Sequence, residues 1–281
     1  MEEYIWREGW QEAFVRQLRA EERSRGTVEK YLRDVERFST WLAGRAATRE
    51  EAVAWKEALL QKGYAPATIN SMLAAVNKFS QFMGWTECRV KALRLQRRMF
   101  RPADRELTRE EYSRLVAAAQ TRGRERLGLL LETICATGIR VSEVAYITVE
   151  AVERERAEIS LKGKIRTILL PKRLCQKLRK YARHKKIVSG EIFLTRNGTG
   201  LSRQQIWAEM KALCQQAGVA PEKVFPHNLR HLFARTFYQT CRDVVKLADM
   251  LGHSSVETTR IYLLTTSEEH ARDLERLRLV S

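Results

Sequence analysis

The chain has 281 residues, of which 44% are hydrophobic and 30% are charged, so it is too apolar to be disordered and long enough for two compact domains. Lys and Arg (51) outnumber Asp and Glu (34), which gives a formal net charge of +17. This excess makes nucleic acid the first partner to consider, with a solvated basic surface as the alternative.

Secretion and membrane insertion are both disfavoured by the sequence. The five cysteines are odd in number and far apart, with no Cys-x-x-Cys pair, which is typical of reduced thiols in a cytosolic protein. The first residues, MEEYIWREGW, lack a basic region followed by an apolar run, and no window is long enough to cross a bilayer. We therefore expect a cytoplasmic protein without a membrane partner.

The first hundred residues read almost wholly as helix. Thr27 is a candidate N-cap, and apolar residues follow it at spacings of four, three and four: Tyr31, Val35, Phe38 and Leu42. These positions share one helical face, which is more typical of a core than of a binding site.

Two further helices are predicted in this half of the chain. Thr48 and Glu51 have the spacing of a capping box, and Pro66 stands where a first-turn proline would start the third helix. That helix continues through the apolar positions Ile69, Leu73, Val76 and Phe79. Residues 1–97 are therefore expected to form a small helical domain.

A charged stretch without periodicity separates the two predicted domains. Residues 98–107 contain Pro102 and are expected to be the linker, whose basic residues could also touch a DNA backbone. Thr108 and Glu111 form another capping box, so the second domain is expected to span 108–281.

The second domain is predicted to pass from helix to a short strand pair and back to helix. Residues 157–171 contain alternating and β-branched apolar positions on either side of Gly163, which indicates a β-hairpin. The chain after Ser202 again reads as helix. The predicted fold is therefore mainly α with one small hairpin.

Residues that handle phosphate concentrate in three separated segments: A-T-G-I-R at 136–140, H-N-L-R-H at 227–231, and 251–262, which includes L-G-H-S and R-I-Y. His227 and Arg230 are three residues apart and share one helical face. If Arg140 approached from elsewhere in the fold, two guanidiniums could hold one phosphodiester and stabilise the extra charge of a pentavalent transition state.

The third of these segments is predicted to be a junction between helices. Gly252 is a candidate C-cap of the first helix. Ser254 and Glu257 have capping-box spacing for the next helix, which would carry Tyr262 about two turns in. His253 therefore lies between the two helices.

The order and spacing of these residues resemble the tyrosine recombinase (phage integrase) family. The matching elements are Arg140 in A-T-G-I-R-V-S-E, the H-x-x-R of His227 and Arg230, and L-G-H-S with Tyr262 nine residues after His253. In the N-terminal half, T-V-E-K-Y-L-R-D-V-E-R-F-S-T-W-L and A-P-A-T-I-N-S-M-L resemble the core-type DNA-binding domain of Xer-like members. The resemblance covers nearly the whole chain.

The resemblance implies a site-specific DNA recombinase whose two domains form a C-shaped clamp around duplex DNA, with no metal or nucleotide cofactor. Tyr262 would attack the scissile phosphate to give a 3′-phosphotyrosyl intermediate, and Arg140 and Arg230 would clamp that phosphate. His227 would serve as general base or proton shuttle, and His253 would donate to a phosphate oxygen.

A lysine on the hairpin protonates the leaving 5′-oxygen in this family. Here L-K-G-K-I-R resembles the usual G-K-G-x-K-x-R pattern, and Lys162 is the matching residue. Because Leu161 replaces the first glycine and one residue is missing before Lys164, Lys164 is a second candidate.

Two more residues adjoin the family motifs. Glu143 matches an acidic position and would orient Arg140 or His227, with a surface ion pair as the alternative. His231 points about 100° away from Arg230 on a helix, so it is expected to pack or to make a secondary DNA contact.

The last segment is predicted to be a short amphipathic helix over about residues 267–279, after a capping box at Thr266 and Glu269. The resemblance implies that it docks on a neighbouring protomer in a tetrameric synapse, although packing on its own domain fits the sequence equally well. An accessory protein could also take part.

The chain is expected to start directly in the core-binding domain, which favours a Xer-like or simple integrase, chromosomal or from a mobile element, acting at the nucleoid. Integration, excision and dimer resolution remain alternatives. Two rival functions are a type IB topoisomerase, with the same chemistry on one strand, and a non-catalytic DNA-binding accessory protein.

Overall fold

The computed structural model describes residues 9–95, 105–161, 164–253, 255–263, 272 and 275–277. The chain divides into two compact units, Met1–Arg97 and Arg98–Ser281. Both are mostly helical, and the described residues contain a single two-stranded antiparallel sheet. The prediction of a mainly α fold with one hairpin is confirmed.

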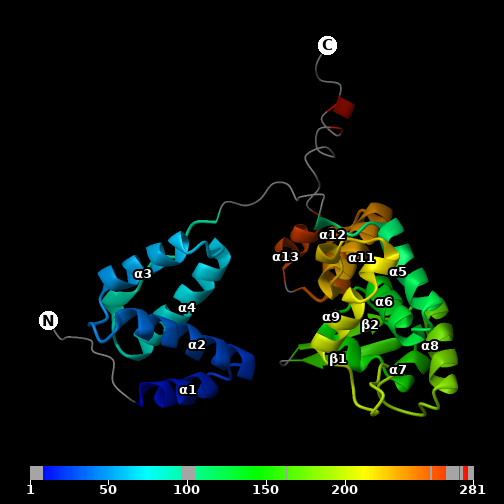
Figure 1. Ribbon diagram of the computed structural model, residues 1–281, viewed down its shortest axis with the longest axis horizontal. Helices are drawn as coiled ribbons and strands as arrows, with labels where there is room; N and C mark the ends of the chain where they lie inside the picture. Colours follow the sequence, from blue (N-terminus) through cyan, green and yellow to red (C-terminus); the bar gives the residue numbers. More distant parts are fainter. Residues whose placement is uncertain are drawn as a thin grey trace. The chain divides into compact units, whose positions relative to one another are not determined.

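Unit 1 is a small helical bundle (Figure 1). Its elements are α1 (Trp10–Ala20), α2 (Arg25–Leu42), α3 (Arg49–Gln61), α4 (Pro66–Phe82) and the 3₁₀ helix η1 (Thr86–Cys88). The predicted apolar positions of α2 and α4 lie in one buried cluster, which includes Val35, Phe38 and Phe79, except that Tyr31 is partly buried and packs against it. Burial of these side chains is the main stabilising contribution to the unit.

The helix starts in unit 1 follow the predictions with one correction. Thr27 is not the N-cap of α2: Ser24 is, and Thr27 lies in the first turn with its hydroxyl 2.9 Å from that of Ser24. Thr48 caps α3 by accepting from the amide of Glu51 (3.2 Å). The capping box is only half formed, because the Glu51 carboxylate pairs with Arg45 instead.

Unit 2 contains the sheet and most of the helices (Figure 1). Its elements are α5 (Arg109–Thr121), α6 (Glu125–Thr137), η3 (Val141–Tyr146), α7 (Val149–Glu153), β1 (Arg156–Leu161), β2 (Lys164–Leu169), α8 (Lys172–His184), α9 (Arg203–Lys211), α10 (Cys214–Ala217), η4 (Pro221–Lys223), α11 (Pro226–Cys241), α12 (Val244–Leu251), α13 (Val256–Arg260) and η5 (Ile261–Leu263). The predicted capping box at Thr108 and Glu111 is present at the start of α5.

Helix α6 runs through the centre of unit 2. Most of its circumference is apolar, and Leu127, Leu130, Leu131 and Ile134 are all fully buried, while Glu125 and Ala136 are exposed. A helix with this pattern must be covered on most sides, and α5, α8 and α11 pack against it. The position of its C-terminal end, which leads to Arg140, is therefore fixed by the core.

The predicted hairpin is confirmed with different bounds: it begins at Arg156 and ends at Leu169, whereas 157–171 was predicted, because Pro171 already caps α8. Strand β1 pairs with β2 in a register that sets Ile159 opposite Arg166 and Leu161 opposite Lys164. Its turn, with Lys162 and Gly163, lies outside the described residues. So does the predicted helix at 267–279, apart from Arg272 and Glu275–Leu277.

None of the helices in the described part of the chain is long and apolar enough to cross a membrane. The five cysteines are free thiols, and Cys88, Cys175 and Cys214 are buried. This agrees with the reading of the cysteines as unpaired.

Gly138 ends α6 in the left-handed conformation (φ 63°) and allows close packing above it. A Cβ there would lie 2.7 Å from Cε1 of Phe233 and 3.0 Å from Leu251. We predict that Gly138→Ala lowers the free energy of unfolding by about 1–2 kcal/mol for the backbone strain and a further roughly 1–3 kcal/mol for overpacking, measured by urea denaturation.

Gly218→Ala is the matched control for this prediction. Gly218 also ends a helix with positive φ (59°), but a Cβ there meets nothing within 4 Å. The control should show the strain cost alone. Equal losses in the two variants would contradict the claim that tight packing at Gly138 holds the end of α6.

Candidate active site

The buried guanidinium of Arg230 joins the predicted segments. Arg230 lies in the first turns of α11 and is 1% exposed. Its Nη1 donates to the carbonyl of Gly138, its Nη2 to the carbonyl of Leu251 (2.8 Å) and to Nε2 of His253 (2.9 Å), and its Nε to the hydroxyl of Tyr262 (3.4 Å). The three segments singled out in the sequence therefore meet at one side chain.

The start of α11 is held by residues between the motif positions. Pro226 occupies the first turn, and the side-chain amide of the buried Asn228 donates to the carbonyls of Arg105 (2.9 Å) and Lys223 (2.8 Å). Asn228 thus ties the helix start to the preceding loop. These hydrogen bonds also fix the backbone position of Arg230, two residues later, which faces the site.

Arg140 and Arg166 share one buried carboxylate. Glu143, 2% exposed, accepts from the backbone amide of Arg140 (2.8 Å), from Nη1 of Arg140 (2.9 Å) and from Nη2 of Arg166 (2.5 Å). Arg140 also donates to the carbonyl of Gly252 (3.4 Å), and Arg166 to that of Met250 (3.4 Å). The alternative of a surface ion pair for Glu143 is wrong, because this carboxylate is buried beneath both guanidiniums.

The electrostatics of the site are strongly positive. Burial lowers the pKa of Arg230 from its ordinary value, and the charges of Arg140 and Arg166 lower it further. Burial likewise lowers the pKa of Arg166, against the raising effect of Glu143. Three guanidiniums thus converge with one carboxylate between two of them, an arrangement suited to binding an anion.

His253 is neutral and its ring orientation is fixed on both sides. Burial lowers its pKa to about 4, and Arg230, Arg140 and Arg166 add to the effect. Its Nε2 must accept from Arg230, because an arginine side chain has only donors. The ring proton therefore lies on Nδ1, which donates to the hydroxyl of Thr259 (2.7 Å).

Tyr262 lies in η5 and is 6% exposed. Its ring is surrounded by three histidines: the ring centroids lie 5.5 Å from His227, 4.3 Å from His231 and 5.5 Å from His253, which is stacked on it. The guanidinium carbon of Arg230 lies 5.8 Å from the same centroid. The phenol is thus held between aromatic rings and a cation.

The expectation that His231 packs is confirmed, and its partner in this packing is Tyr262. His231 is 6% exposed and its ring is nearer to that of Tyr262 than the ring of His227 is. His231 points about 100° away from Arg230 around the helix, but it lies one turn after His227 and therefore shares the helical face of His227. The two histidine rings are in edge contact at 4.8 Å.

The helix that leads to Tyr262 starts one residue later than predicted. Ser255, not Ser254, is the N-cap of α13, and it accepts from the amide of Glu257 (3.2 Å). Ser254 lies outside the described residues. Helix α13 is short and passes into η5 before Tyr262, while Gly252 ends α12 as predicted.

Arg166 is a residue of the site that the sequence analysis passed over. The sequence could have indicated it, because Arg166 is the last residue of L-K-G-K-I-R, the hairpin segment that resembles the family pattern. Lys162 lies outside the described residues, and for Lys164 the structure describes only the backbone, at the start of β2. The structure therefore brings together Arg140, Glu143, His227, Arg230, His253 and Tyr262 of the predicted set.

Comparison with known proteins gives consistent matches over both units. The model of the phage integrase family matches residues 105–269, and that of the phage integrase N-terminal SAM-like domain matches 12–87. Tyrosine recombinase XerA of Pyrococcus furiosus is 30% identical over 96% of this chain and 94% of its own length. Tyrosine recombinase XerC of Roseiflexus castenholzii is 31% identical over 89% and 87%.

Solved structures share the fold. A lambda integrase tetramer bound to a Holliday junction superposes with a TM-score of 0.74 at 17% identity, over 93% of this chain and 78% of that one. The Tn1549 transposon integrase in complex with transposon right end DNA gives 0.69 at 16% identity, over 97% and 99%. At these identities the likeness concerns the fold alone.

The Thr259 hydroxyl is fully buried, so water cannot replace it as partner of His253. We predict that Thr259→Val, which keeps the shape and removes the hydroxyl, lowers the free energy of unfolding by about 1–3 kcal/mol, because a buried N–H loses its acceptor. Thr259→Ser should retain most of the stability. Equal stability of the Val variant and the unaltered protein in urea denaturation would contradict this reading of the hydrogen bond.

Proposed function

The chain belongs to the phage integrase family of tyrosine recombinases, and from this premise we propose that it cuts and rejoins DNA at specific sites with Tyr262 as the covalent nucleophile. The observation that carries the assignment of Tyr262 is its hydroxyl, 3.4 Å from Nε of the buried Arg230. A phenol at this position would meet any phosphate that the arginines bind.

We assign phosphate binding to Arg140 and Arg230. Their guanidiniums could hold the non-bridging oxygens of a phosphodiester and stabilise the charge that grows as a fifth oxygen approaches phosphorus. Glu143 would be the positioning residue for Arg140, since it accepts from both the side chain and the backbone amide of that arginine. Arg166 adds positive charge from the other side of Glu143.

The proposed reaction is a transesterification. The oxygen of Tyr262 forms a bond to phosphorus as the bond to the 5′-oxygen breaks, and the reverse step, with a 5′-hydroxyl as nucleophile, releases Tyr262. His227 would take up the phenolic proton, its ring lying 5.5 Å from that of Tyr262. Lys162, or Lys164 in its place, would protonate the leaving 5′-oxygen. Because the phosphotyrosyl bond conserves the energy of the broken phosphodiester, neither ATP nor a metal is required.

Entry of the phosphate would rearrange one hydrogen bond. Arg230 has five N–H donors, and four are taken by Gly138, Leu251, His253 and Tyr262. The contact with His253 is the exchangeable one, because His253 is itself expected to bind the phosphate. To donate from Nε2, the neutral ring would move its proton from Nδ1, and the Thr259 hydroxyl could then donate to Nδ1 after rotating.

The two units would have different roles. We assign duplex DNA binding to unit 1, over residues 1–97, with 98–107 as linker and 108–281 as the catalytic domain. The lambda integrase neighbour is a tetramer on a Holliday junction, and we propose a tetrameric synapse here, with the segment at 267–279 docking on a neighbouring protomer. Its site of action would be the nucleoid in the cytoplasm, with or without an accessory protein.

We predict that nicked suicide duplexes from the protein's own genomic neighbourhood trap it as an SDS-resistant DNA adduct without metal or ATP. Tyr262→Phe should form none, because it lacks the attacking oxygen while keeping the ring that packs on the histidines. Gel electrophoresis of the denatured reaction measures this.

An adduct with Tyr262→Phe, or none with the unaltered protein on any duplex that it binds, would contradict the assignment. Adducts with relaxation of supercoiled DNA but no exchange between two sites would indicate a topoisomerase instead.

A further inference from the structure

A basic face lies on unit 2 at the end of α6 opposite to the catalytic residues. It consists of Lys180, Arg183, Lys185 and Lys186 on and after α8, and Lys185 lines a hollow together with Arg124 and Arg196. Arg140 follows the C-terminal end of α6, whereas Arg124 precedes its first residue. The 13 residues of α6 therefore separate the two places by about 20 Å.

The charge on this face is concentrated. Residues 172–186 contain eight Lys and Arg and no Asp or Glu, in a chain whose net charge is +17. Lys180, Arg183, Lys185 and Lys186 are all exposed. In the described part of the chain, none of these four forms an ion pair, although Lys177 and Arg179 on the same helix do.

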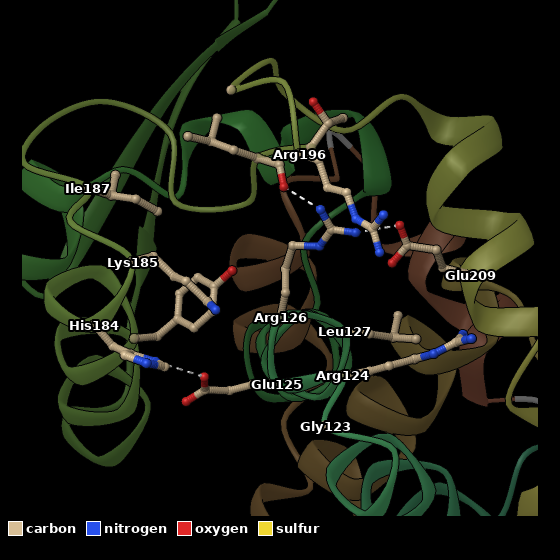
Figure 2. A pocket seen from close by; sticks show the side chains of 14 residues that line it. Gly123, Arg124, Glu125, Arg126, Leu127, His184, Lys185, Ile187, Arg196 and Glu209 are labelled. Carbon is tan, nitrogen blue, oxygen red and sulfur yellow. Dashed lines mark hydrogen bonds and ion pairs between the residues drawn. The ribbon is translucent and has the colours of Figure 1, made fainter.

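The hollow beside α8 has a volume of about 910 Å³. Arg124 and Arg126 at the start of α6 and Arg196 before α9 also line it (Figure 2). Arg126 is neutralised there by Glu209, 2.5 Å away, and His184 faces Glu125 at 3.6 Å. Arg124 and Arg196 have no ion pair among the residues that the structure describes. Arg124, Lys185 and Arg196 outnumber the one remaining carboxylate, Glu125, so the walls of the hollow keep an excess of positive charge.

The positive charge extends beyond this hollow. Lys180 lines a neighbouring hollow that shares Gly123 and Glu125 with the first, and Arg183 and Lys186 line another that shares Ile187. A single small anion would need the cations to converge on one point. Cations spread over adjoining hollows fit a long polyanion whose charges repeat along its length.

The hollow beside α8 has few exposed apolar side chains to which a protein partner could bind. Protein interfaces are built around buried apolar and aromatic anchors. Among the large exposed hydrophobic side chains of the described residues, Val188 is the one that borders these hollows, and Tyr181 beside them is already buried. The hollow at Arg183 and Lys186 has an apolar lining that includes Val149, Val152 and Ile187. The hollow of Lys185, Arg124 and Arg196 has no exposed large hydrophobic side chain, and its charge favours a sugar-phosphate backbone.

We propose that this face binds the phosphate backbone of duplex DNA, independently of base sequence and away from the scissile phosphate. The proposal takes DNA as substrate from the proposed function but concerns a surface that shares no residue with the catalytic set. It would hold flanking DNA or a second duplex while the catalytic site is occupied. Each lysine or arginine that meets a phosphate contributes by counterion release.

The test compares two four-site variants of the full chain. In the neutral variant, Lys180, Arg183, Lys185 and Lys186 are all changed to Gln. In the charge-retaining control, the lysines are changed to Arg and Arg183 to Lys. All four side chains are exposed, so both variants should keep the unaltered melting temperature.

The Kd for a long fluorescent duplex is measured against salt concentration. We expect the logarithmic slope of the neutral variant to be less steep by about 3.6, at about 0.9 per lost phosphate contact, with the control unchanged. An equal slope for the neutral variant and the unaltered protein would overturn the proposal. Polyglutamate binding that the neutral variant loses, together with an unchanged salt slope for the duplex, would also overturn it, in favour of an acidic protein.

The adduct assay separates this proposal from the proposed function. If the unaltered protein forms no adduct, the assignment of Tyr262 fails, whereas the salt slopes still decide the role of the basic face. If both variants form adducts at saturating protein but have the same slope, the recombinase assignment stands and the basic face does not bind DNA.

Discussion

The buried guanidinium of Arg230 is the interaction on which the rest of the site depends. A charge at 1% exposure is costly unless hydrogen bonds compensate for the lost water. Its acceptors come from the ends of α6 and α12, from the junction after α12 and from η5. Satisfying one side chain therefore requires four parts of the chain to meet, and this meeting brings Tyr262 to the arginines.

The second constraint is the balance of charge. Arg140, Arg166 and Arg230 influence one another, and Glu143 is the carboxylate between the first two. This leaves an excess of positive charge, held by backbone carbonyls at Gly138, Met250, Leu251 and Gly252. Such a site is prepared for an anion before the anion arrives, which is the condition for electrostatic catalysis without reorganisation.

The sequence predicted those parts of the molecule that depend on local chemistry. Capping at Thr48 and Thr108, the helix start at Pro66, the hairpin and the C-cap at Gly252 follow from short-range hydrogen bonding and backbone preferences. The family motifs supplied the catalytic candidates. Proximity across the fold was harder: Arg166 reaches Glu143 from a strand, and His231 reaches Tyr262 only because η5 returns to α11. Where two candidate N-caps lie within a few residues of each other, the sequence pattern selected the wrong one: the N-caps are Ser24 and Ser255.

We propose that a phosphodiester displaces His253 from Arg230 and that His253 then donates to the phosphate while Thr259 stabilises the other tautomer. The most direct measurement is the nitrogen-15 chemical shift of both ring nitrogens of His253, recorded in Tyr262→Phe protein without DNA and with a bound target duplex. We expect a proton on Nδ1 in the free protein and on Nε2 in the complex. A ring that keeps its proton on Nδ1 alone when DNA is bound would contradict it.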